Sequence, residues 1–213
     1  MYETFYHNLP NGVQIVHRRT SSPVVYVGIM VGAGTRHELP NENGMAHYIE
    51  HCVFKGTEHY TARQIINHIE GIGGEINAYT TKEETTFYAA TLRNHFHTTL
   101  HLLAEMVLHP TFNKKETDKE VTVILDEIES YNDSPSELIY DDFENMILRA
   151  VRWQCQSLAP RKLSAAFPSH PISPSIGCSS TTAPSVWCSS LWAMSPPNKS
   201  SPPRKKNSSP HHL

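Results

Sequence analysis

Acidic residues stop at Glu144, and this boundary limits how much of the chain can fold as one unit. All 21 Asp and Glu of the 213-residue chain lie in residues 1–144 with 10 of the 18 Lys and Arg, which gives this part a formal charge of −11. Residues 145–213 contain no acid, and 25 of these 69 residues are Ser or Pro. Such a composition supplies few apolar side chains for a core. We therefore expect a folded unit over residues 1–148 and a separate Ser/Pro-rich tail over residues 149–213.

The same composition excludes several classes of protein. No stretch approaches the roughly 18–20 consecutive apolar residues of a membrane helix, and the N-terminus lacks the basic start and apolar stretch of a secretory signal. We therefore expect no membrane partner and a cytoplasmic location. The acidic balance of residues 1–144 argues against a nucleic-acid partner, which requires clustered Lys and Arg. Only Cys52 of the four cysteines lies in this part, so we expect neither a disulfide framework nor a Cys-based zinc site.

The apolar pattern of the first part predicts an α+β fold with a largely antiparallel sheet. Runs rich in β-branched and aromatic residues predict strands over residues 12–18, 24–31, 75–80 and 85–92, with a hairpin turn at 82–84. Apolar residues at helical spacing predict helices over residues 45–54, 61–70, 94–109, 113–131 and 134–148. Two strands, two helices, two strands and three helices in that order are typical of helices packed on an antiparallel sheet.

The segment from His47 to His51 is the most informative for chemistry. Two histidines four residues apart on a helix point from the same face and can bind one metal ion. Zinc suits imidazole ligands, and Glu50 is close enough to take a proton from water at a catalytic zinc. The order His-x-x-Glu-His is a metallopeptidase motif. The alternative is that these are two surface histidines on an amphipathic helix.

A catalytic zinc site needs a third protein ligand, and the helix predicted over residues 113–131 supplies candidates. Seven residues make almost two helical turns, so Glu120 and Glu127 share one face, with Glu116 one turn earlier. One carboxylate could bind the metal while another hydrogen-bonds a ligand histidine and fixes its tautomer. The alternative is a solvated acidic face without a metal.

Several ordered motifs resemble the inverzincin peptidases of the M16, or pitrilysin, family. The resemblance runs from about Leu9 to about Asn145. It is carried by three motifs: Gly44-x-x-His47-x-x-Glu50-His51-x-x-x-Lys55-Gly56-Thr57, Gly73-Gly74-Glu75-x-Asn77-Ala78-Tyr79-Thr80, and Glu120 separated by six residues from Glu127-Ile128. The flanking Leu9-x-Asn11-Gly12 and Gly34-x-Arg36-x-Glu38 are also similar. The resemblance implies the fold of a metallopeptidase half-domain, here incomplete.

The roles of individual residues follow from this resemblance. His47 and His51 match the two zinc-binding histidines, and Glu127, 76 residues after His51, matches the zinc-binding glutamate. Glu50 matches the catalytic base that activates water, and Glu120 matches a glutamate that supports a ligand histidine. The implied cofactor is one Zn²⁺ per chain.

The resemblance also implies a substrate site and a partner. Asn77 and Ala78 match a strand edge along which the substrate backbone binds, a case of β-strand addition. Members of the family enclose a peptide or protein substrate with a second domain of similar fold. The implied partners are therefore the substrate and a second M16-like domain or subunit that closes the chamber.

The resemblance ends near Arg149, and two interpretations of the tail remain open. One is a disordered natural tail. The other, which we favour, is that the message has left its reading frame in or just after the helix at 134–148, because an evolved soluble tail rarely combines three Trp and three Cys with no acid. The sequence therefore predicts a zinc-dependent endopeptidase domain that is truncated and weak or inactive alone. The alternative is a non-catalytic scaffold or assembly subunit of the same fold, or an inactive fragment.

Overall fold

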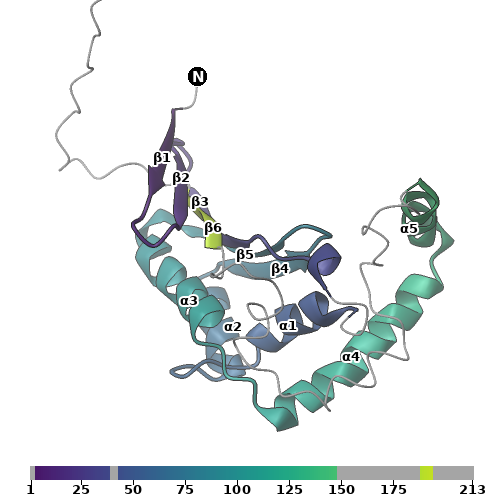
Figure 1. Cartoon of the computed structure of the whole chain (residues 1–213). Helices are drawn as coiled ribbons and strands as arrows, with labels where there is room; N and C mark the ends of the chain where they lie inside the picture. Colours follow the sequence, from purple (N-terminus) through teal and green to yellow (C-terminus); the bar gives the residue numbers. More distant parts are fainter. Residues whose placement is uncertain (1–2, 39–42, 148–187, 194–213) are drawn as a thin grey trace, which may run out of the picture.

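The computed structural model describes residues 3–38, 43–147 and 188–193 as one sheet with helices packed against it (Figure 1). The strand order is β1-β2-β6-β3-β5-β4. The strands are β1 (Thr4–Asn8), β2 (Gln14–Arg18), β3 (Val24–Val31), β4 (Glu75–Thr80), β5 (Thr85–Leu92) and β6 (Cys188–Ala193). The helices are α1 (Met45–Val53), α2 (Ala62–Glu70), α3 (Phe96–Leu108), α4 (Lys114–Asn132) and α5 (Pro135–Ile147), with short 3₁₀ turns η1 (Thr35–His37) and η2 (Arg93–His95).

The predicted α+β class with a largely antiparallel sheet is confirmed. The pairs β1–β2, β3–β5, β4–β5 and β3–β6 are antiparallel, and β2–β6 is parallel. The sequence did not predict β1, whose five residues are all exposed and so show no alternation of buried and polar positions. It also did not predict β6, which lies between β2 and β3. The rest of residues 149–213 lies outside the described residues, so the domain boundary and both interpretations of the tail stay predictions.

One face of the sheet carries the main core. Along β3 the side chains of Val25, Val27 and Ile29 are buried, whereas Tyr26 between them is 53% exposed. This alternation turns one face of the sheet toward α1, α2 and α3, which lie together on that side in Figure 1. The buried residues that these three helices contribute are Val53, Ile65, Ile69, Leu102, Leu103 and Met106.

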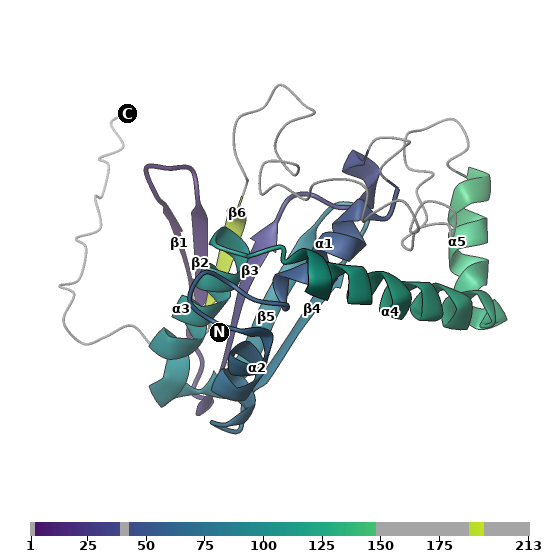
Figure 2. The same cartoon turned by 90° about the horizontal axis from the view of Figure 1, so that it is seen from below.

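A second, smaller core fixes α4 against α1. Met45, Tyr48 and Cys52 of α1 are buried against an apolar stripe of α4, and the Tyr48 hydroxyl donates to the carbonyl of Thr117 at 3.2 Å. Figure 2 shows α4 running from α1 to α5. The stripe of α4 consists of Val121, Ile124 and Ile128. In the part of the chain that is described, no helix is long and apolar enough to cross a bilayer.

The loop after α1 is tied to α3 by one ion pair. His59 Nδ1 lies 2.7 Å from Glu105 Oε1, and the Glu105 side chain is 8% exposed. The hydrogen bond with Glu105 raises the pKa of His59 above its usual value, and the same bond lowers the pKa of Glu105. The pair therefore stabilises the fold fully at pH values above the ordinary pKa of Glu and below the ordinary pKa of His.

We expect the His59→Ala variant to lose more stability at about pH 6 than at about pH 8.5. As the pH rises through the raised pKa of His59, the imidazolium loses its proton and the contribution of the pair to folding is lost. Urea midpoints of wild type and variant at both pH values measure this difference. His101→Ala, which removes an exposed histidine of α3, is the control. An equal loss at both pH values would contradict the expectation.

Candidate metal centre

The helix that carries the two histidines begins at a tight, capped turn. Gly44 precedes α1 with φ 85°, a left-handed conformation that favours glycine. Glycine has no side chain to cap the helix, and the Glu38 carboxylate takes this role by accepting from the backbone N–H of Gly44 at 2.7 Å and of Ala46 at 2.8 Å. A carboxylate at a helix N-terminus is also favoured by the helix dipole. The start of α1 is therefore fixed two residues before His47.

The structure brings His47, His51 and Glu127 together at the contact between α1 and α4. The Nε2 atoms of the two histidines lie 3.2 Å apart. Glu127 Oε2 lies 3.4 Å from His51 Nε2 and 3.7 Å from His47 Nε2. The three atoms form a nearly regular triangle. The Glu127 side chain is 48% exposed and the His47 side chain 10%, so the triangle faces solvent on the α4 side.

This triangle fits a tetrahedral metal ion. Zinc bonds to imidazole nitrogen and carboxylate oxygen at about 2.0–2.2 Å, which places ligand atoms about 3.4 Å apart along the edges of a tetrahedron. The observed separations of 3.2, 3.4 and 3.7 Å match such an edge. Three protein ligands leave a fourth position, as in catalytic zinc sites. These residues therefore fit a zinc ion, which His47, His51 and Glu127 could hold.

The protonation of His47 and Glu127 suits metal binding. Burial, together with the charge of His51, lowers the pKa of His47 to about 4, so this imidazole is neutral at physiological pH. The hydrogen bond from His51 lowers the pKa of Glu127, which keeps its carboxylate ionised. Neutral imidazole and ionised carboxylate are the forms that bind metals. Within the described residues His47 Nδ1 is buried without a hydrogen-bond partner.

Glu120 lies behind His51 and is itself held by Lys55. His51 Nδ1 lies 3.3 Å from Glu120 Oε2, and Lys55 Nζ lies 2.7 Å from Glu120 Oε1. Burial lowers the pKa of His51, but hydrogen bonds to Glu127 and Glu120 outweigh it and raise the pKa overall. The Glu120 side chain is only 8% exposed, and each of its two carboxylate oxygens has a partner in the protein. This arrangement orients the ring of His51 with Nε2 toward Glu127.

Glu50 lies on α1 between the two histidines, and its carboxylate is directed toward β4. The residue is 9% exposed, and its Oε2 accepts a hydrogen bond from Thr80 Oγ1 at 2.5 Å. Burial raises the pKa of Glu50, against the opposing effect of the Thr80 hydrogen bond. A buried carboxylate with a raised pKa is a typical general base.

Asn77 and Ala78 lie on β4, which is the last strand of the sheet. The β4–β5 register pairs Asn77 with Tyr88 and Ala78 with Phe87. The Asn77 side chain is exposed, and its Oδ1 accepts from the Ala78 N–H at 2.8 Å. Among the residues that the structure describes, β4 is therefore an edge strand, and Thr80 lies at its end.

Three residues around the site were given no role from the sequence. Lys55 lies in the turn that follows α1, and its spacing of four residues from His51, about one helical turn, is the signal that could have identified it. Thr80 and Glu38 carry no such signal, because their contacts with Glu50 and with the start of α1 depend on how β4 and η1 pack against that helix.

The chain is similar in sequence to known proteases and peptidases. The family model described as insulinase, peptidase family M16, matches residues 14–160. The chain is 42% identical over 132 residues to an uncharacterized zinc protease, YmxG, of Bacillus subtilis, covering 62% of this chain and 32% of that protein. It is 36% identical over 140 residues to a probable mitochondrial-processing peptidase subunit beta of Arabidopsis thaliana, covering 65% of this chain and 26% of that protein.

The fold is also that of a known protease. A protease from Helicobacter pylori superposes with a TM-score of 0.72 at 24% sequence identity, over 78% of this chain and 40% of that one. The chain spans only about a quarter to a third of the length of the two curated relatives. The family match covers more than half of the chain and includes α1, β4 and α4. The chain therefore belongs to the insulinase family of peptidases, M16.

Proposed function

We propose that the chain is the zinc-binding part of a metalloendopeptidase that hydrolyses peptides or small proteins. The triangle of His47, His51 and Glu127 beside the buried carboxylate of Glu50 is the observation that carries this proposal. A zinc ion held there would supply Lewis-acid polarisation and lower the pKa of water. Relatives named as zinc proteases support the choice of metal.

Glu50 acts as the general base in this proposal. Its carboxylate takes a proton from the water molecule as the water oxygen forms a bond to the carbon of the scissile peptide carbonyl. The same carboxyl group then passes that proton to the amide nitrogen as the carbon–nitrogen bond breaks. Glu120 and Lys55 hold the His51 ring in place throughout. The reaction consumes one water and releases two peptide ends.

We propose that the substrate backbone binds along β4. This strand is the edge of the sheet in the described residues, and its end carries Thr80, which contacts Glu50. An extended peptide added to an edge strand receives main-chain hydrogen bonds that do not depend on its sequence. The Asn77 side chain, which now covers the N–H of Ala78, would move to admit the substrate.

We further propose a second M16-like domain or subunit as the partner that closes the site. The relatives are about three to four times as long as the matched segment, and one is named as a subunit. The α5 helix carries large apolar side chains that are 59–72% exposed, a surface that suits burial against another protein unit. These residues are Ile139, Tyr140, Phe143, Met146 and Ile147.

Zinc titration of the zinc-free chain tests the metal site. We expect one zinc per wild-type chain, and we expect Glu127→Gln to weaken zinc binding by more than about a hundredfold. Changing a group that hydrogen-bonds a metal ligand typically lowers metal affinity about 10–100-fold, and losing a ligand itself should lower it further. Asp126→Asn, the exposed neighbour on the same helix, is the matched control and should bind like wild type. Emission spectroscopy measures the zinc content of each protein, and competition with a chromogenic chelator measures its zinc affinity.

Equal zinc affinity of wild type and Glu127→Gln would refute the ligand assignment. Hydrolysis of an internally quenched peptide by the wild-type chain, lost on chelation and restored by zinc, would support the peptidase function. Zinc binding with no hydrolysis of any peptide would favour the non-catalytic scaffold instead.

A further inference from the structure

The hydroxyl of Thr80 is the group that fixes the carboxylate of Glu50. Among the described residues it is the one hydrogen-bond donor to this carboxylate, and it contacts Oε2 at 2.5 Å. Glu50 is 9% exposed, so water has little access to replace this bond. A hydrogen bond to a charged group in such a place is about twice as strong as one between neutral groups.

The direction of the Thr80 hydroxyl is set by a second threonine. Thr85, its partner across the β4–β5 hairpin, places Oγ1 3.4 Å from Thr80 Oγ1 and donates its own proton to the carbonyl of Ala33 at 2.9 Å. A threonine hydroxyl has one proton to donate. Because the proton of Thr85 is directed to Ala33, Thr85 has none to give to Thr80. The proton of Thr80 is then directed to the nearer, charged acceptor, Glu50.

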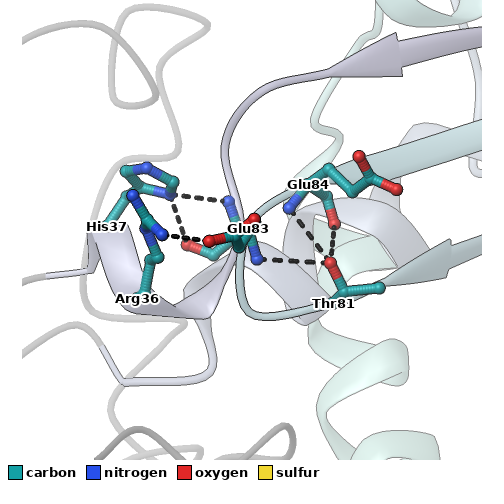
Figure 3. A network of polar contacts seen from close by, with 6 residues as sticks. Arg36, His37, Thr81, Glu83 and Glu84 are labelled. Carbon is teal, nitrogen blue, oxygen red and sulfur yellow. Dashed lines mark hydrogen bonds and ion pairs between the residues drawn. The ribbon is translucent and has the colours of Figure 1, made fainter. Parts of the chain in front are cut away.

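The segment that holds Ala33 is itself joined to the turn between β4 and β5. The N–H of Thr35 donates to the carbonyl of Thr81 at 3.1 Å, and the N–H of Arg36 donates to the carbonyl of Lys82 at 3.0 Å. Figure 3 shows Thr81 Oγ1 accepting from the amides of Glu83 and Glu84, and Arg36 paired with Glu83. Thr80 and Thr85 therefore lie at the two ends of a turn that is held by hydrogen bonds from Thr35 and Arg36 and by hydrogen bonds within the turn.

We propose that Thr80 is a positioning residue for the general base, holding Glu50 by Oε2 and leaving Oε1 as the oxygen that accepts the proton of water. The catalytic part of this inference rests on the proposed function. The bond between Thr80 and Glu50 does not need the metal, and it can be tested in the zinc-free chain.

A double-mutant cycle in the zinc-free, full-length chain measures the bond directly. Thr80→Val keeps the shape of the side chain and removes the donor, and we expect it to lower the folding equilibrium constant about tenfold. In a Glu50→Met background, where no carboxylate needs the donor, we expect the same change to alter the constant less than about twofold. Thr86→Val is the control, because Thr86 Oγ1 is buried with no hydrogen-bond partner in the described parts of the chain.

Peptide hydrolysis by the zinc-loaded chain measures the positioning role. We expect Thr80→Val to lower kcat about tenfold with KM unchanged, and Thr80→Ser, which restores the hydroxyl, to recover most of that loss. Thr86→Val should behave like wild type. Zinc content should be the same in all four proteins, since none of these side chains is a ligand.

The outcomes separate this inference from the proposed function. A coupling below about twofold in the zinc-free cycle overturns the inference whether or not the chain cleaves peptides. A wild-type chain that cleaves peptides, with kcat unchanged in Thr80→Val or not recovered in Thr80→Ser, overturns the positioning role alone. A wild-type chain that binds zinc but cleaves nothing refutes the peptidase activity and with it the catalytic role of Thr80.

Discussion

Replacing Glu50 by Gln is expected to lower the rate of peptide hydrolysis by about 10²–10⁴-fold, the usual contribution of a positioned general base. Glutamine has almost the same shape and can still accept the hydrogen bond from Thr80, so the fold and the position of the side chain should be kept. What it lacks is a carboxylate oxygen that can take the proton of water. The loss should therefore appear in kcat, measured with an internally quenched peptide in the presence of zinc.

Zinc binding separates this result from damage to the site. Glu50 is not one of the three residues whose ligand atoms converge, so Glu50→Gln should bind one zinc per chain, as we propose for wild type. Glu58→Gln, a change of the same kind in the exposed loop after α1, should leave the rate unaltered. If Glu50→Gln cleaved the peptide at the wild-type rate, Glu50 would not be the base, and another carboxylate near the site would have to be sought.

Replacing Gly34 by Ala is expected to destabilise the fold by about 3 kcal/mol, the upper range for overpacking. A Cβ atom at this position would lie 2.3 Å from the carbonyl oxygen of Thr81 and 2.7 Å from the backbone nitrogens of Glu83 and Glu84. All three atoms belong to the main chain, so no side chain can rotate away. The turn between β4 and β5 would have to move away from η1.

Urea denaturation of wild type and Gly34→Ala measures this loss of stability. Gly73→Ala is the matched control, because no atom of the described part of the chain lies within 4 Å of its added Cβ and the change is opposed by its left-handed φ of +72°. We expect the control to lose about 1 kcal/mol. Equal losses in the two variants would show that the close contact at Gly34 is relieved at little cost.

Most of the secondary structure around the site could be predicted from the sequence, because it depends on local patterns. The helix that carries His47 and His51 was expected over residues 45–54 and is observed as Met45–Val53, and the next strands, expected over residues 75–80 and 85–92, have the same bounds in the structure. Apolar residues at spacings of three and four, or alternating residues, determine such elements directly. The first strand, β1, has no buried residue and so leaves no such pattern.

The environment of the site could be predicted less well. The spacing of Glu120 and Glu127 places both on one face of a helix, but only the packing of α4 on α1 shows that this face meets the histidines. Lys55 and Thr80 belong to motifs that were read from the sequence, yet their contacts depend on the position of α4 and on the strand register. Contacts between elements that are far apart in the chain are not determined by any local pattern.

The position of the candidate ligands on two helices has a consequence for the chain as a whole. His51 and Glu127 are separated by 76 residues, which include α2, β4, β5 and α3. An ion bound to both would act as a reversible cross-link around that loop and would reduce the conformational freedom of the unfolded chain, as a disulfide does. If the chain were cut in the turn between β4 and β5, the two pieces would stay joined through the metal, and removing the metal would weaken their association.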